Sequence, residues 1–218
     1  MPRRIVRPIH REVDLAGRLL EFDELPQPWN GGEALFGNAN PLEVELGSGK
    51  GMFLRRATAD RSEHNFLGLE VSHKYARYCA AQLVRDGRDN ARVMSGDGLR
   101  VFHEVLTDAS VEAVHVYFPD PWWKKRHRKR RVLNEAFLKD AARVLRSGGA
   151  VHFWTDVKEY FESTLELIAQ LQQQGLPLEG PHDVPEPPAE HHLDYRTHFE
   201  RRTRLNHQPV YRSLFLKP

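Results

Sequence analysis

Short apolar runs alternate with longer amphipathic segments along the chain from Pro41 onward. The apolar runs are typical of buried strands, and they cover residues 42–46, 65–71, 91–95, 113–118 and 150–155. The amphipathic segments carry their apolar residues largely on one side, which predicts helices over residues 52–59, 74–85, 99–106, 134–145 and 160–173. Strands that alternate with helices at this spacing imply parallel crossover connections. The pattern therefore predicts an α/β fold with a doubly wound, mostly parallel sheet and helices on both faces.

The two ends of the chain depart from this alternation. The segment from Pro2 to Arg11 is basic and interrupted by prolines, so we expect it to be loosely ordered. Residues 177–190 are rich in proline and acids and predict an irregular segment, whereas residues 210–216 predict a closing strand. We interpret the chain as one domain over residues 36–218, preceded by a basic and flexible arm over residues 1–35.

The totals exclude several classes of protein. A chain of 218 residues fits one domain with a full core, and no apolar run approaches the ~20 residues of a membrane span. The single cysteine, Cys79, excludes an internal disulfide and a cysteine-based zinc site. We expect a cytoplasmic protein without a bound metal, and we interpret His191 and His192 as a solvated pair. Both a monomer and a homodimer are compatible with the sequence.

Positive charge is concentrated in a few places, although the net charge is only +2. Seven of the eight residues 124–131 are Lys or Arg, and Trp122 and Trp123 stand directly before them. Two prolines flank Asp120 and restrict the backbone, so its carboxylate is held at a fixed place after a buried strand. One acid, two aromatic faces and a dense run of cations indicate a nucleic acid as the partner.

A glycine-rich loop follows the first predicted strand. Ligands of such sheets bind beyond the carboxyl ends of the strands, and there the chain reads Glu45-Leu-Gly-Ser-Gly-Lys-Gly51. Gly47, Gly49 and Gly51 allow a tight turn and a close approach to a ligand. Their spacing fits neither a P-loop nor the dinucleotide pattern G-x-G-x-x-G, which disfavours a dehydrogenase. With Glu45 two residues before the first glycine, the loop suits a ligand that has a cationic amino-acid group and no pyrophosphate, such as S-adenosylmethionine.

Acids also stand at the ends of three further predicted strands. Glu70 occupies the place at which nucleotide-binding α/β proteins hold ribose hydroxyls, and Asp97 could accept a hydrogen bond from an adenine amino group. Either residue could instead be an exposed capping acid. Asp156, after the fifth strand, is a candidate either for a helix N-cap or for holding substrate.

Four motifs together resemble the bacterial tRNA (guanine-N7-)-methyltransferase family. They are Glu45–Gly51, Gly68–Val71, Phe118–Trp122 with Lys124–His127, and Thr197–Arg201. The likeness extends from about residue 36 to the C-terminus. It implies a Rossmann-like class I S-adenosylmethionine-dependent methyltransferase that acts on the variable-loop guanosine of tRNA.

The resemblance also implies roles for single residues. The residues expected to contact the cofactor are Glu45, Glu70, Asp97 and Asp120, and Asp120 is also the expected catalytic carboxylate. The residues expected to hold the tRNA are Lys124, Asp156, Thr197, His198, Phe199 and Glu200. Two alternatives stay open: a methyltransferase that acts on another nucleobase or a small molecule, and a non-catalytic RNA-binding protein that keeps the fold.

Overall fold

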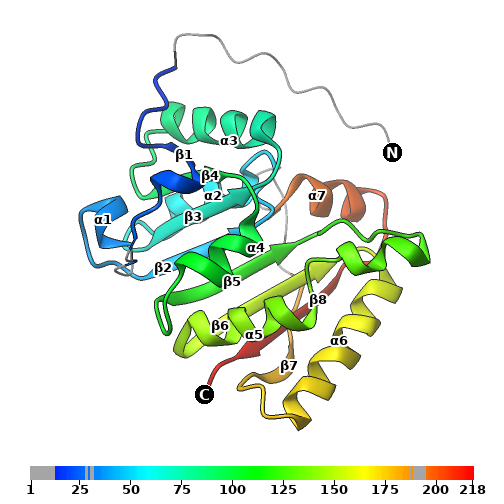
Figure 1. Ribbon diagram of the computed structural model, residues 1–218. Helices are drawn as coiled ribbons and strands as arrows, with labels where there is room; N and C mark the ends of the chain where they lie inside the picture. The colour runs from blue at the N-terminus through cyan, green and yellow to red at the C-terminus, as the bar shows by residue number, and fades with distance from the viewer. Residues whose placement is uncertain (1–12, 28, 30–31, 187, 189–194) are drawn as a thin grey trace.

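The computed structural model describes residues 13–27, 29, 32–186, 188 and 195–218. They contain an eight-stranded sheet of order β1-β4-β3-β2-β5-β6-β8-β7 (Figure 1). The strands are β1 (Leu19–Glu21), β2 (Leu42–Leu46), β3 (Asn65–Glu70), β4 (Ala91–Ser95), β5 (Val111–Tyr117), β6 (Leu145–Thr155), β7 (Glu179–Asp183) and β8 (Tyr211–Leu216). Strands β1 to β6 pair in parallel with one another, and β8 runs antiparallel to both β6 and β7.

Helices connect the strands and cover both faces of the sheet (Figure 1). They are α1 (Glu33–Phe36), α2 (Met52–Asp60), α3 (His73–Arg85), α4 (Gly98–Arg100), α5 (Glu135–Val144), α6 (Lys158–Gln173) and α7 (His198–Leu205). A π-helical turn (Val101–Val105) continues α4, and two 3-10 turns cover Phe22–Glu24 and Lys125–Arg130. The side chain of Asn134 caps α5, because it accepts a hydrogen bond from Phe137 N at 3.1 Å.

The core lies in two layers, one on each side of the sheet. Leu67 and Leu69 of β3 join the larger cluster with residues of α5 and α6, whereas Phe66 joins the other cluster with residues of α2 and α3. All of β3 is buried, as a parallel strand covered on both faces requires. The predicted doubly wound, mostly parallel α/β fold is confirmed.

Two edge strands were not predicted. β1 lies in the range 1–35 that we assigned to an arm, yet it pairs in parallel with β4. β7 lies in the segment 177–190 that we predicted to be irregular, and it pairs antiparallel with β8. Both strands are short, and β7 is mostly exposed, so neither shows the apolar alternation that marks a buried strand. Part of the assigned arm thus belongs to the sheet, while residues 1–12 lie outside the described residues.

The structure also bears on membrane insertion. Among the residues it describes, no helix combines the length and the apolar character needed to cross a bilayer.

A candidate active site at the carboxyl ends of the parallel strands

The loop between β2 and α2 folds back onto the end of β3. The backbone N–H groups of Gly47 and Ser48 donate to Leu69 O at 2.8 and 3.0 Å, and Gly49 N donates to Glu70 Oε2 at 2.8 Å. The loop is therefore held at the rim where a ligand of a parallel sheet binds.

The loop depends on its glycines. Gly47, Gly49 and Gly51 all have positive φ angles, which side chains other than glycine rarely adopt. At Gly51 a Cβ atom would also lie 2.2 Å from Cys79 Sγ on α3. The loop approaches α3 so closely that position 51 requires glycine for two independent reasons.

Glu70 joins the loops that follow β2 and β3. Besides the bond from Gly49, its Oε1 accepts a hydrogen bond from Ser72 N at 2.8 Å. Each carboxylate oxygen has a second lone pair, so Glu70 can shape the rim and still accept from a ligand.

Glu45 is buried beside this loop, and no cation or hydrogen-bond donor among the described residues offsets the burial of its Oε2 atom. It is 3% exposed, and its Oε2 has no hydrogen-bond partner among the described residues. Burial raises the pKa of Glu45 well above its ordinary value, and the nearby Glu70 raises it further. A buried carboxylate of this kind is stabilised either by a proton or by a cationic partner. Glu45 therefore fits a ligand that brings a positive charge into the rim.

Asp97 stands at the same rim, after β4. In the register of the sheet Leu46 lies opposite Leu69 and Glu70 lies opposite Ser95, so the three strands end level with one another. Asp97 is exposed and caps α4, because its Oδ1 accepts a hydrogen bond from Leu99 N at 2.9 Å. The capping alternative is thus realised, and it leaves lone pairs of the carboxylate open to solvent.

The end of β5 has a strained backbone. Phe118 has a φ of 50° and Trp122 a φ of 46°, a region in which a bulky residue costs on the order of 1–3 kcal/mol and which is common at functional sites. The left-handed turn at Phe118 breaks the alternation of β5, so that Tyr117 and Phe118 both pack in the cluster with α2 and α3. The chain then leaves the sheet toward the exposed Asp120.

A hollow of about 400 Å³ lies beside Asp120. Its lining residues are Asp120, Pro121, Trp122, Trp123, Lys124 and His127. Trp123 is 68% exposed, so much of its indole ring faces solvent. The hollow offers a carboxylate, aromatic faces and a cation within one short loop, which are the groups that hold a nucleobase and its phosphate.

Arg131 braces this loop against α6. Its guanidinium donates to Pro121 O at 2.9 Å and to Glu159 Oε2 at 2.6 Å, and it lies over the ring of Tyr160 at 4.4 Å. Arg128 reaches the other oxygen of Glu159 at 3.1 Å. The sequence did not distinguish Arg131 from the other cations of the run, and only its position directly before the apolar Val132-Leu133 hinted at burial.

The other cations of the run form an exposed ledge. We define residues 124–130 as the cationic ledge. Arg130 lies over the ring of Trp122 at 5.0 Å and Arg128 pairs with Glu159. The remaining cations, Lys124, Lys125, Arg126 and Lys129, occupy exposed positions.

Asp156 follows β6 at the same end of the sheet. The N-cap of α6 is Val157, and no side chain caps that helix, so the capping alternative for Asp156 is wrong. Among the described residues no hydrogen bond or ion pair engages this half-buried carboxylate.

The segment 197–200 forms the start of α7. Thr197 caps the helix by accepting from Glu200 N at 3.0 Å, and the buried Glu200 accepts from Arg196 N at 2.6 Å. Their side chains thus organise the segment itself, while His198 and Phe199 are exposed. The ring of Phe199 stacks on Phe118 at 6.2 Å, which holds α7 beside the loop that follows β5 (Figure 1).

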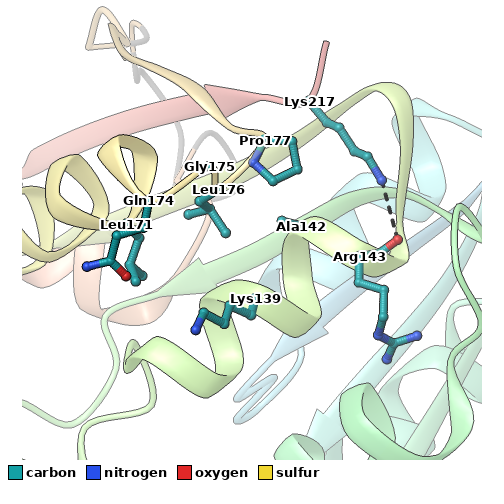
Figure 2. A pocket seen from close by; sticks show the side chains of 9 residues that line it. All are labelled: Lys139, Ala142, Arg143, Leu171, Gln174, Gly175, Leu176, Pro177 and Lys217. Atoms are coloured by element: carbon teal, nitrogen blue, oxygen red, sulfur yellow. Dashed lines mark hydrogen bonds between the residues drawn. The ribbon is translucent and has the colours of Figure 1, made fainter.

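A second hollow, of about 300 Å³, lies at the opposite end of the sheet between the end of α5 and the turn after α6 (Figure 2). Its cations already serve the fold: Lys217 donates to Leu145 O at 2.6 Å, and Arg143 to Phe102 O at 2.6 Å. This hollow does not belong to the strand-end site.

No group of three or more His, Cys, Asp or Glu side chains is arranged so that it could hold a metal ion in the described part of the chain. His191 and His192 lie outside it.

Comparison with known proteins identifies the family. Residues 39–213 match a family model described as "Putative methyltransferase". The tRNA (guanine-N(7)-)-methyltransferase of Rhodopirellula baltica is 46% identical over 225 residues, which cover 100% of this chain and 80% of that protein. The chain belongs to the tRNA (guanine-N7-)-methyltransferase family. The match spans residues 1–35 as well, where the motifs alone showed no likeness.

A further member supports the family, and a solved structure shares the fold. The family member of Salmonella choleraesuis is 37% identical over 152 residues, or 70% of this chain and 62% of that protein. The solved structure of the antibiotic-resistance methyltransferase Kmr has a TM-score of 0.57 at 16% identity and covers 87% of this chain and 93% of its own. At that identity the likeness shows the fold alone.

Proposed function

We propose that this protein transfers the methyl group of S-adenosylmethionine to N7 of the variable-loop guanosine of tRNA in the cytoplasm. The observation that carries the proposal is the unpaired buried carboxylate of Glu45 at the glycine loop. On the same edge of the sheet, Asp120 borders an aromatic hollow next to the cationic ledge. Membership of the family supports tRNA as the substrate.

The residues of the rim fit S-adenosylmethionine. Glu45 would pair with its ammonium group, Glu70 would accept from the ribose hydroxyls, and Asp97 would accept from the adenine amino group. Gly47, Gly49 and Gly51 let the backbone approach the amino-acid part. When bound, the cofactor supplies an electrophilic methyl group on a sulfonium centre.

The acceptor atom defines what the protein must do. Guanine N7 has an in-plane lone pair and no proton, so no base has to remove a proton before the attack. Most of the acceleration then comes from holding N7 in line with the methyl group, an effect that can reach ~7–11 kcal/mol. Asp120 would accept from an N–H edge of guanine and stabilise the positive charge that develops on the ring.

The RNA would be held from both sides of Asp120. The cationic ledge suits the phosphates, with Lys124 nearest to Asp120 in the chain, and Trp123 offers a face on which a base can stack. Asp156 and the segment Thr197–Glu200 border the same end of the sheet. We assign the direct contacts to Asp156, His198 and Phe199, with Thr197 and Glu200 holding the start of α7 in place.

Nucleoside analysis tests the proposal directly. An unmodified tRNA transcript is incubated with the protein and S-adenosylmethionine, digested to nucleosides and compared with a transcript whose variable-loop guanosine is replaced by cytidine. We expect one 7-methylguanosine per tRNA from the first transcript and none from the second. Methylation of another atom or base, or binding of both ligands without transfer, would overturn the proposal.

A further inference from the structure

A buried chain of polar side chains runs from the start of α7 into the sheet. Arg196 Nη1 donates to Tyr117 Oη at 2.8 Å. Tyr117 Oη is 2.9 Å from His115 Nδ1, and His115 Nε2 is 2.6 Å from Glu43 Oε2. Tyr117, His115 and Glu43 are all buried. The activity proposed above does not use any of these side chains.

The donor and acceptor of each hydrogen bond among these four side chains can be assigned in only one way. Burial would raise the pKa of Glu43, but His115 and Arg61 outweigh burial and lower it, so Glu43 is ionised and only accepts. Burial lowers the pKa of His115, so its ring is neutral: Nε2 donates to Glu43 and Nδ1 accepts. Tyr117 then donates to His115 and accepts from Arg196, which has only donors. Every member is satisfied in this one arrangement, which favours a single geometry.

The same end of β5 contacts the start of α7 a second time. While Tyr117 accepts from Arg196, the next residue, Phe118, stacks on Phe199. The guanidinium of Arg196 also lies over the ring of Trp154 at 4.7 Å. The start of α7 and the residue before its N-cap are therefore held by two consecutive residues, Tyr117 and Phe118, and Asp120 follows Phe118 by two residues.

We infer that Tyr117 and Arg196 are positioning residues for RNA recognition, which fix the segment 197–200 relative to the loop of Asp120. The inference rests on the proposed function, because the KM for tRNA can be measured only if the protein methylates tRNA. In this assignment neither residue contacts the reacting atoms. Both act through the exposed His198 and Phe199.

The inference predicts a selective effect on RNA. Without the Tyr117 hydroxyl, the guanidinium of Arg196 loses its acceptor and His115 Nδ1 loses its donor. A hydrogen bond to a charged group of this kind corresponds to about a tenfold to hundredfold change in an equilibrium constant. The glycine loop and Glu45 keep all of their contacts, so the affinity for S-adenosylmethionine should not change.

The experiment compares the wild type, Tyr117→Phe, Arg196→Met and the double variant in the full chain. It measures the KM for tRNA, kcat, the affinity for tRNA by filter binding, and the affinity for S-adenosylmethionine by calorimetry. The matched control is Thr58→Val, which removes a buried hydroxyl that donates to Leu54 O at 2.7 Å and does not contact α7. The control should leave the KM for tRNA unchanged.

We expect each single variant to weaken tRNA binding and raise the KM for tRNA about tenfold. The double variant should be no worse than either single one, because both remove the same bond. Unchanged tRNA binding in both single variants, multiplied effects in the double variant, or an equal loss of cofactor affinity in Arg196→Met would overturn the inference.

If Tyr117→Phe does not fold, the result for Arg196→Met alone decides, because this variant leaves the buried hydrogen bonds among Tyr117, His115 and Glu43 intact. A wild type that binds tRNA but transfers no methyl group would instead contradict the proposed function, and filter binding would still test the inference.

Discussion

Glu43 and Glu45 lie two residues apart on β2, and both are buried, yet their surroundings differ completely. Glu43 is paired with His115, His64 and Arg61, whereas Glu45 has an oxygen without any partner among the described residues. The pKa of the first is lowered and that of the second is raised. Only the carboxylate nearer to the glycine loop is left uncompensated. At the residue scale, this difference distinguishes Glu43, which stabilises the fold through its partners, from Glu45, which is suited to bind a cationic ligand.

The raised pKa of Glu45 predicts a pH dependence of cofactor binding. The free protein carries a proton on Glu45 between the ordinary carboxyl range and the raised pKa, and an ammonium group prefers the ionised form. The affinity for S-adenosylmethionine should therefore rise with pH through this window, and calorimetry in buffers of different ionisation enthalpy should detect proton release. Glu45→Gln should bind more weakly and lose both effects. A pH-independent affinity in the wild type would contradict this role.

The sequence predicted which acids lie at the strand ends, but it did not predict which side chains pair with one another around the site. Glu45, Glu70 and Asp97 were recognisable because the end of a buried strand is visible in the apolar pattern. Two partners were not recognisable: Arg131 lies within a uniform run of cations, and Arg196 meets Tyr117 across 79 positions of sequence. Such pairs depend on how the chain returns to the sheet, which the local pattern does not contain.

At the scale of elements, the strands β2 to β6 were predictable and the edges were not. Central parallel strands are buried on both faces and read as apolar runs, as the fully buried β2 and β3 show. The edge strands β1 and β7 owe their conformation to backbone pairing with β4 and β8. The side chains of these edge strands therefore give little indication of a strand in the sequence.

The glycine loop predicts a difference between two similar substitutions. Gly47→Ala places a Cβ where no atom lies within 4 Å, whereas Gly51→Ala places one 2.2 Å from Cys79 Sγ. Both substitutions place alanine at a positive φ, but only Gly51→Ala must also displace α3. Gly51→Ala should therefore lower the free energy of unfolding by about 1–3 kcal/mol more than Gly47→Ala. Urea denaturation of both variants without ligand measures the difference. Equal stabilities would show that the loop does not press on α3.

The cationic ledge predicts a salt effect. Lys124, Lys125 and Arg126 are exposed and suited to phosphates. Their joint replacement by alanine should weaken tRNA binding and reduce the slope of log affinity against log salt by about 2–3. Filter binding over a range of salt concentrations measures the slope.

A charge-matched control separates this effect from net charge. Alanine at Arg56, Lys139 and Arg146 removes the same charge from residues that are paired with acids elsewhere on the surface. This control should keep the slope of the wild type. An identical loss in both triple variants would mean that the ledge has no local role.

At the scale of the whole molecule, the sheet brings two chemically different surfaces to one edge. Glu45 and Glu70 at the ends of β2 and β3, with Asp97 after β4, form the part suited to a cationic cofactor. The loop after β5 forms the part suited to RNA. Arg131 and the stacked pair Phe118 and Phe199 fix that loop between α6 and α7. A net charge of only +2 is compatible with RNA binding because seven cations are concentrated in residues 124–131, shortly after the end of β5.

We propose that Asp120 lies between these two surfaces, and single-turnover methyl transfer by Asp120→Ala is the most direct test of the arrangement. The transfer rate is measured with saturating tRNA and S-adenosylmethionine, next to the affinity for the cofactor, with the exposed Asp108→Ala as the control. We expect Asp120→Ala to retain measurable cofactor binding and to lose about 10²-fold or more in rate, while the control transfers normally. Transfer by Asp120→Ala at nearly the wild-type rate would contradict the central claim.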